Sequence, residues 1–266
     1  MARIFSVANQ KGGVGKTTTA INLGTALAIA EQSILVVDMD PQGNLTSGVG
    51  LKGQTAPAGT IYQALTASDD IRDPSTFLLE TRVKNLWIVP ADRNLTGAEV
   101  ELVPMPNREG RLRDLVHRLR DRFDYILIDT PPSLGLLTLN ALVASDAVLI
   151  PLTCEYFALE GLADLVSTLR RVRAALNPSL DIAGVVMTMY DERTNLGQQV
   201  ARDIRQFFQD RVFTTVIPRN IRLGEAPSHG LPAILYDVKS RGSEAYLALA
   251  REFLAREATP TEPSHG

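Results

Sequence analysis

This chain of 266 residues has only one cysteine, no long apolar run and no excess of positive charge. The single cysteine, Cys154, can form no disulfide, zinc site or cysteine-ligated cluster within one subunit. No apolar run approaches the roughly 18–20 residues that a membrane-spanning helix needs. The formal net charge is −3, so any contact with nucleic acid must come from a local basic patch and not from overall attraction.

The composition is that of a soluble globular protein. Hydrophobic residues make up 45% of the chain and charged residues 21%, which suits a sizeable buried core. The first strand-like segment begins within a few residues of Met1 and leaves no room for a signal peptide, so we expect a cytoplasmic protein. We expect one domain over residues 1–256 and a disordered polar tail, EATPTEPSHG, over residues 257–266.

Buried strands and amphipathic helices alternate along the sequence. Segments rich in Val, Ile and Leu, without strict alternation of apolar and polar residues, indicate strands that are buried on both faces. We expect such strands at 4–8, 33–38, 86–90, 125–129, 147–151, 182–189 and 212–217. Apolar residues recur every three or four positions and predict helices at 17–30, 111–122, 161–176, 196–209 and 243–255. This order predicts an α/β fold with a single doubly wound, mostly parallel sheet flanked by helices.

The stretch most informative about function lies between the first strand and the first helix. It reads KGGVGKTT and comprises Lys11, Gly12, Gly13, Val14, Gly15, Lys16, Thr17 and Thr18. Glycines let backbone N–H groups surround an anion, and the helix N-terminus adds the positive end of its dipole. In a phosphate-binding loop, Lys16 would bridge the β- and γ-phosphates of a nucleotide and the Thr17 hydroxyl would ligate Mg²⁺. The alternative is a glycine-rich turn that only caps a helix.

Lys11 is one lysine more than a phosphate-binding loop requires. It lies too early in the loop to replace Lys16. We therefore expect Lys11 to offer its charge to a different nucleotide, across a dimer interface.

Carboxylates follow two of the expected strands. Asp38 and Asp40 close the second strand, and Asp129 closes the strand at 125–129. The carboxyl ends of parallel strands gather ligands, so these side chains should face the phosphate-binding loop. We predict that Asp40 orients the attacking water, that Asp38 supports it near Mg²⁺, and that Asp129 holds Mg²⁺ through a water. The alternative is that Asp38 and Asp40 only end the strand and cap the next turn.

These motifs resemble those of the deviant Walker A ATPases of the ParA/MinD group. The runs DMDPQGN and IDTPPSLG belong to the same resemblance as KGGVGKTT. The segments 188–200, 216–230 and 236–246 are similar to the ParA/Soj branch, which partitions chromosomes and plasmids. The resemblance extends over about residues 3–255 and implies a P-loop NTPase that uses ATP and Mg²⁺ and hydrolyses ATP slowly.

The resemblance also implies roles for single residues of the nucleotide site. Lys11 matches the lysine that reaches the ATP of the partner subunit, and Gly12 matches the glycine at that close contact. Asp40 matches the aspartate whose loss blocks hydrolysis. Pro218 and Asn220 match the segment that flanks the adenine. An ATP-dependent homodimer is therefore implied.

Partners are implied in the same way. Arg193 and Arg222 match arginines that contribute to non-specific binding of double-stranded DNA, and a ParB-like centromere-binding protein would stimulate hydrolysis. The protein would then be associated with the nucleoid. From composition alone, the mixed charges of residues 190–242 are more typical of an ordinary solvated surface.

Other functions of the same fold fit the sequence less well. A MinD-like positioning ATPase would need an amphipathic, basic terminal helix for the membrane, whereas this chain ends in EATPTEPSHG. An iron protein would need two cluster cysteines per subunit. An ATP-dependent synthase would leave Lys11 without a role, and a site-specific repressor would need a helix-turn-helix before the first strand. The sequence leaves open whether the protein segregates DNA, positions another cargo or regulates replication initiation.

Overall fold

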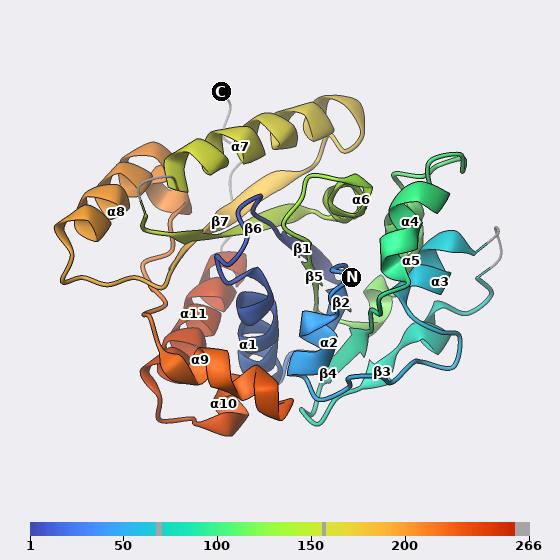
Figure 1. The fold of residues 1–266 in the computed structure, drawn as a ribbon, viewed down its shortest axis with the longest axis horizontal. Coiled ribbons are helices and arrows are strands. Elements are labelled where there is room, and N and C mark those ends of the chain that lie inside the picture. Colours follow the sequence, from blue (N-terminus) through green and yellow to red (C-terminus); the bar gives the residue numbers. More distant parts are fainter. Residues whose placement is uncertain (68–70, 156–157, 259–266) are drawn as a thin grey trace.

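One sheet organises the structure, a computed structural model that describes residues 1–67, 71–155 and 158–258, with backbone only at 158–160. Within this part of the chain the sheet has seven strands in the order β3-β4-β2-β5-β1-β6-β7 (Figure 1). Their bounds are β1 (Arg3–Val7), β2 (Ile34–Asp38), β3 (Leu79–Glu80), β4 (Leu86–Val89), β5 (Tyr125–Asp129), β6 (Ala147–Thr153) and β7 (Asp181–Thr188). All neighbouring pairs are parallel except β3 with β4, which confirms the expected mostly parallel sheet.

Helices cover both faces of this sheet, as Figure 1 shows. The longer ones are α1 (Lys16–Ile29), α4 (Leu95–Glu101), α5 (Arg111–His117), α6 (Leu136–Ala144), α7 (Ala158–Ala175), α8 (Asn195–Phe208) and α11 (Arg241–Ala258). The shorter ones are α2 (Asn44–Gly48), α3 (Ile61–Thr66), α9 (Ile221–Glu225) and α10 (Ala233–Tyr236), with 3₁₀ turns at Pro74–Phe77, Arg120–Arg122, Gln209–Arg211 and Ala226–His229.

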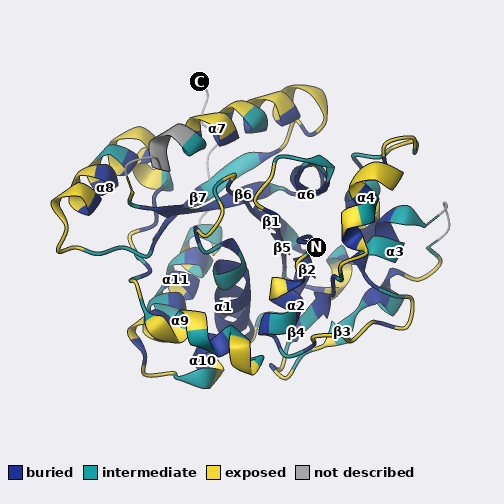
Figure 2. Cartoon of the chain, viewed as in Figure 1, coloured by how far each residue is buried: buried dark blue, intermediate teal, exposed yellow. Residues whose placement is uncertain are grey.

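The core is layered about the sheet. Side chains of α1 and α11 pack on one face around Phe5 and Phe253, whose rings meet edge to face at 5.0 Å. Helices α3 to α6 cover the other face over the central strands, and α7 and α8 cover it over β6 and β7. Figure 2 shows this division, with buried strands and inner helix faces and with exposed residues on the outside. The expected doubly wound fold is confirmed.

Most of the expected elements are present. The six expected strands from 4–8 to 182–189 are confirmed to within two residues at each end. The expected helix at 111–122 is shorter, because α5 ends at His117 and a separate 3₁₀ turn follows at Arg120–Arg122. Helix α6 was not expected, because most of its residues are buried and its sequence has no polar face.

The expected strand at 212–217 is wrong. This segment touches the edge of β7 only at isolated points. The N–H groups of Thr214 and Thr215 donate hydrogen bonds to the Glu252 carboxylate of α11, at 2.7 and 2.8 Å, so they are not available to a strand ladder. The seventh strand is instead β3, a two-residue antiparallel edge strand.

The C-terminal helix continues past residue 256. Glu257 and Ala258 are the last residues of α11, and the Glu257 carboxylate pairs with Arg3 at 2.5 Å. Residues 259–266 of the expected polar tail lie outside the described residues. None of the described helices is both long enough and apolar enough to cross a membrane.

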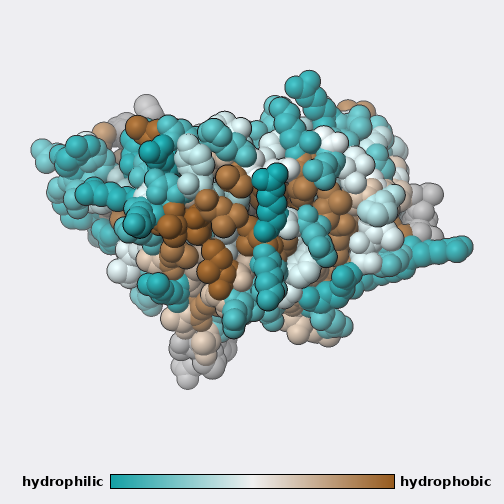
Figure 3. All heavy atoms as spheres, turned by 90° about the horizontal axis from the view of Figure 1, so that it is seen from below, coloured by the Kyte–Doolittle hydropathy of each residue, from teal (hydrophilic) through white to brown (hydrophobic). Residues whose placement is uncertain are grey.

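The surface is mixed in polarity. Figure 3 shows one face on which hydrophobic residues gather near the centre. Hydrophilic residues surround this area and also divide it. Large apolar side chains that are exposed include Ile29, Val100, Val103, Leu176, Leu196, Phe207, Ile221, Leu235 and Val238. Two of these, Val103 and Leu176, line a groove beside α6.

Candidate functional site

The loop between β1 and α1 has the backbone shape of an anion-binding cradle. Gly13 and Gly15 have φ values of 72° and 86°, in the left-handed region that glycine adopts without strain. The Thr188 hydroxyl, at the end of β7, donates a hydrogen bond of 2.8 Å to the Val14 carbonyl. This contact holds the middle of the loop against the sheet, while α1 begins immediately after Gly15. The N-terminus of α1 therefore lies at the base of the loop.

The first part of the loop is held by Asn9. Its side chain donates to the Pro151 carbonyl at 2.8 Å and accepts from the Lys11 N–H at 3.0 Å. Asn9 itself is 3% exposed. The loop is therefore shaped by contacts within the chain on both sides of its glycines.

Lys16 is a buried cation at the first position of α1. Its ammonium donates to the Lys11 carbonyl at 3.3 Å, the only hydrogen bond found for it among the described residues. Burial lowers the pKa of Lys16, and the nearby carboxylates of Asp129 and Asp40 oppose that shift. A buried ammonium with so few partners is suited to bind phosphate oxygens.

Asp129 is the least satisfied group of the site. It is fully buried, and neither carboxylate oxygen has a hydrogen-bond partner among the described residues. Burial and the charge of Asp38 raise the pKa of Asp129 well above its usual value. The Thr17 hydroxyl lies near enough to favour the charged form, although no hydrogen bond of normal geometry joins the two. A buried carboxylate without donors beside a threonine hydroxyl fits a divalent cation that prefers oxygen ligands.

Asp38 lies opposite Asp129 in the β2–β5 register but has a different environment. One of its oxygens accepts from the N–H and the hydroxyl of Thr46, at 2.9 and 2.7 Å, and the other accepts from the Asp40 N–H at 3.1 Å. Burial nevertheless raises the pKa of Asp38 to about 6. Both oxygens are engaged, so Asp38 anchors α2 and the loop before it.

Asp40 lies in that loop, directly after β2. It is 8% exposed, and its carboxylate accepts from the Gln42 N–H at 2.9 Å. Its charge opposes the lowering of the Lys16 pKa, so the two side chains lie within electrostatic range of each other. The structure therefore brings Lys16, Asp38, Asp40 and Asp129 together at the carboxyl edge of the sheet, as the sequence predicts.

Lys11 points to a different group. Its ammonium pairs with the Glu155 carboxylate at 2.6 Å, and both side chains are partly exposed. Gly12 is exposed as well, and a Cβ built on it would lie at an ordinary contact distance, 3.7 Å from Pro132. Nothing in the described part of the chain requires glycine at this position.

Pro218 and Asn220 lie on the segment that leads into α9. Pro218 forms an isolated bridge with Tyr190, and the Asn220 side chain caps α9 by accepting from the Arg222 N–H at 2.9 Å. A cavity of about 470 Å³ lies here and is lined by Arg219, Asn220, Ile221, Arg222 and Glu225.

Arg193 lies on the loop between β7 and α8, and Arg222 lies in the first turn of α9. Each is already paired within the chain. Arg193 forms two hydrogen bonds with the Asp191 carboxylate, at 2.8 and 2.7 Å. Arg222 pairs with Glu225 at 2.7 Å and with Asp237 at 3.3 Å. In a single chain neither arginine is an isolated positive charge.

Four residues of the site were not identified from the sequence: Asn9, Thr46, Glu155 and Thr188. Glu155 comes two residues after the end of β6. Its position could have been predicted, as that of Asp38 was, because the carboxyl ends of parallel strands gather ligand-binding residues. Asn9 and Thr188 likewise lie at strand ends. Thr46 could not have been found in this way, because its role depends on how α2 folds back onto Asp38.

Comparison with protein families and known proteins gives a consistent result. Residues 2–182 match the family model described as an AAA domain. The chain is 55% identical to the chromosome partitioning protein ParA of Myxococcus xanthus, over 99% of this chain and 91% of that protein. It is 52% identical to the sporulation initiation inhibitor protein Soj of Bacillus subtilis, over 96% of this chain and 99% of that protein.

Solved structures share the fold over nearly the whole length of the chain. A crystal structure of cobyrinic acid a,c-diamide synthase from Mycobacterium smegmatis, with a bound ATP analogue and magnesium, has a TM-score of 0.83 and 34% sequence identity. The match covers 97% of this chain and 97% of that one. The sheet and its flanking helices are therefore those of P-loop ATPases.

Replacing Asp129 with Asn should stabilise the nucleotide-free protein at pH 8 and have little effect at pH 4. Because burial raises the pKa of Asp129, the folded wild-type chain loses stability as the pH rises above the usual value of 3.8, whereas Asn has no proton to lose. We expect a gain of about 1–3 kcal/mol at pH 8, measured by urea unfolding. Asp164→Asn, an exposed substitution on α7, is the matched control. A gain that does not depend on pH would contradict this reading of Asp129.

Proposed function

This chain belongs to the ParA/Soj family of chromosome partitioning ATPases, and we propose that it works as a switch that binds DNA only as an ATP-bound dimer. It is a P-loop ATPase of the deviant Walker A type, with ATP and Mg²⁺ as cofactors. The observation that carries the proposal is Lys11, which does not serve its own loop and lies beside an exposed glycine.

Within one subunit, we propose that the loop from Lys11 to Thr18 holds the phosphates. Its backbone N–H groups and the start of α1 favour negative charge, and Lys16 supplies a buried cation. Thr17 and Asp129 would hold Mg²⁺, which when bound neutralises charge that develops on the phosphates. Asp38 would support this site indirectly, because it fixes α2 through Thr46. The oxygens that lack hydrogen-bond partners belong to Asp129, so Asp129 would be the carboxylate that holds Mg²⁺.

We propose that Asp40 orients the attacking water. It is a nearly buried carboxylate beside Lys16, and its backbone N–H is fixed by Asp38. A carboxylate held in this way can accept a hydrogen bond from water without first reorganising. Pro218, Asn220 and the cavity beside α9 would take the adenine.

The dimer would complete the site. Lys11 would leave Glu155 and approach the phosphates of the nucleotide in the partner subunit, while Gly12 would allow the two loops to meet closely. An exposed ion pair is worth only about 0–1 kcal/mol, so its loss is easily offset by a contact with a highly charged phosphate. ADP lacks the γ-phosphate, which makes the dimer selective for ATP.

DNA binding would follow from the dimer. Two-fold symmetry brings two copies of the surface around Arg193 and Arg222 together, and DNA phosphates would compete with their present carboxylate partners. Contacts of this kind read phosphates and not bases, so binding should weaken steeply with salt. A ParB-like protein at a centromere-like site would then stimulate hydrolysis and release the dimer from the nucleoid.

A second function, that of an ATP-dependent synthase, has less support than the partitioning ATPase. The Mycobacterium smegmatis protein shares the fold, but its identity of 34% is well below the 55% shared with the Myxococcus xanthus partitioning protein. A single-subunit synthase also has no use for Lys11. The same switch could position a cargo other than DNA, and the DNA-binding measurement below separates these cases.

The purified protein should bind random-sequence duplex DNA with ATP and Mg²⁺, and not with ADP or without nucleotide. Asp40→Ala should keep this binding and lose hydrolysis, because it would remove the water-orienting group and leave the phosphate loop intact. Fluorescence anisotropy over a salt series measures the binding. Equal binding in all nucleotide states would contradict the switch, and ATP-dependent dimers without DNA binding would indicate another cargo.

Gly12→Val should prevent dimerisation while ATP still binds. The added side chain meets no close contact within the chain, so thermal stability should be unchanged, whereas in the dimer it would separate the two loops. Analytical ultracentrifugation with ATP measures the dimer. Gly161→Ala, where a Cβ meets nothing within 4 Å, is the control. Normal dimers of Gly12→Val would argue against the proposed interface.

Glu155→Gln should favour the dimer. Removing the carboxylate that now pairs with Lys11 frees that lysine, so the ATP concentration for half-maximal dimerisation should fall by up to about fivefold, the value of an exposed ion pair. Light scattering across an ATP titration gives the midpoint. Glu192→Gln, an exposed change elsewhere, should leave it unaltered. A higher midpoint for Glu155→Gln would mean that Glu155 assists the dimer.

A further inference from the structure

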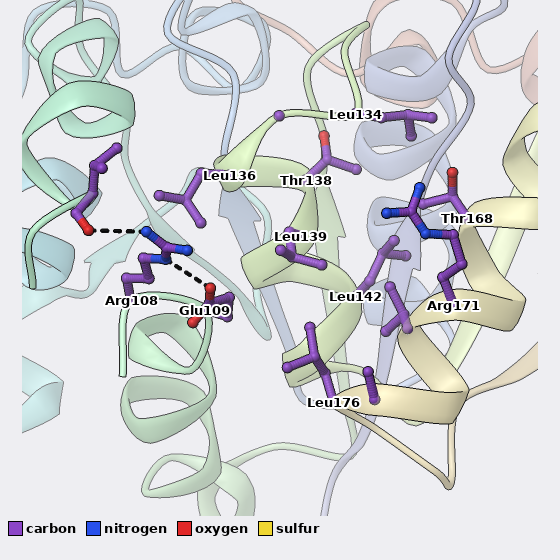
Figure 4. Close-up of a pocket in the computed structure, with 14 residues that line it drawn as sticks. Arg108, Glu109, Leu134, Leu136, Thr138, Leu139, Leu142, Thr168, Arg171 and Leu176 are labelled. Atoms are coloured by element: carbon purple, nitrogen blue, oxygen red, sulfur yellow. Dashed lines mark hydrogen bonds and ion pairs between the residues drawn. The ribbon is translucent and has the colours of Figure 1, made fainter. Parts of the chain in front are cut away.

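A groove beside α6 is separate from the nucleotide site. It has a volume of about 620 Å³ and runs between the segment that joins α4 to α5 and the second half of α7. Figure 4 shows Leu136, Leu139 and Leu142 of α6 along its floor, with Arg108 on one wall and Arg171 on the other. The two walls belong to parts of the chain that are far apart in sequence.

The apolar surface continues out of the groove. Val103 and Leu176, on opposite walls, are 54% and 38% exposed, and Leu136 and Leu139 on the floor are half-buried. Val103 and Leu176 line the groove and are also open to solvent. A peptide lying along the groove would cover them, which is the usual arrangement when an amphipathic helix binds with its apolar face.

The two arginines of the walls differ in their partners. Arg108 pairs with Glu109 at 2.7 Å and also donates to the Val103 carbonyl at 3.0 Å. Arg171 is exposed, and no ion pair or hydrogen bond of its side chain is found within the described part of the chain. The groove therefore has one unpaired positive charge beside an apolar floor, and a ligand with one carboxylate would complement it.

The floor of the groove is joined to the loop that follows Asp129. Helix α6 begins at Leu136, and the Thr138 hydroxyl on the groove side donates to the Ser133 carbonyl at 2.6 Å. The Glu99 carboxylate of α4 lies over Gly135, in the space that a Cβ would take. A ligand that presses on α6 therefore acts on the loop that connects α6 to the buried carboxylate of the nucleotide site.

We infer that this groove binds an amphipathic segment of the partner protein that stimulates ATP hydrolysis. The segment carries leucine-like side chains toward α6 and a carboxylate toward Arg171. The inference rests on the proposed function, because it gives the stimulating partner of that function a docking surface. The groove lies outside the phosphate loop, so its occupant acts through α6 and not by contact with ATP.

The test uses the full-length chain and the ParB-like protein of the same organism, with duplex DNA, ATP and Mg²⁺. Arg171→Glu places a negative charge opposite the expected carboxylate. We expect the partner concentration for half-maximal stimulation to rise by about tenfold or more, while basal hydrolysis and ATP-dependent DNA binding stay unchanged. Arg173→Glu is the matched control, because it reverses an exposed arginine of the same helix that does not line the groove.

Two further variants keep the inference open to refutation. Val103→Ser reduces the apolar rim without a change of charge and should weaken stimulation in the same direction. One acidic residue of the partner, changed to Lys, should restore stimulation of Arg171→Glu and reduce that of the wild type. Normal stimulation of both Arg171→Glu and Val103→Ser would overturn the docking site and leave the proposed function intact. A wild-type protein that the partner does not stimulate would overturn both.

Discussion

The structure depends on a group of charges buried at the carboxyl edge of a parallel sheet. Lys16, Asp38 and Asp129 lie there with little access to water, and Asp129 has no hydrogen-bond donor among the described residues. Buried charge without partners is costly, and it persists because the surrounding strands fix it in place. Phosphates would supply partners for the buried lysine, and a divalent cation would supply one for the buried carboxylate. Without its ligands, the site therefore holds charged groups whose electrostatic partners are missing.

The same charges organise the neighbouring loops. Asp38 binds Thr46, and the Thr46 hydroxyl accepts from the Ala91 N–H at 3.0 Å, so α2 is joined to the sheet on two sides. Just beyond α2, Gly50 lies so close to Gly230 that a Cβ on either would clash with the backbone of the other. The loop that carries Asp40 is thereby connected to the turn before α10, in the segment that also carries Arg222. One buried carboxylate thus positions elements that are distant in the sequence.

The sequence predicted the parts of this arrangement that are local. A glycine-rich loop between a strand and a helix, and carboxylates at strand ends, follow from residue order alone, and the structure has them where expected. The strand expected at 212–217 failed because Glu252, from a distant helix, takes its N–H groups. Helix α6 was missed because burial on nearly all sides removes the polar face that periodicity requires. The partners of Asp38 and Lys11 likewise come from other segments.

Lys11 shows how the incomplete site bears on function. A lysine that served its own loop would turn inward, as Lys16 does, and would be buried by it. Lys11 instead pairs with Glu155 at the surface, where the pair contributes little to stability and remains easy to exchange. Gly12 beside it has room for a side chain that it does not carry. A second subunit would need a surface positive charge that can exchange its partner, and an open approach beside it, so the single chain already has the features that a dimer would use.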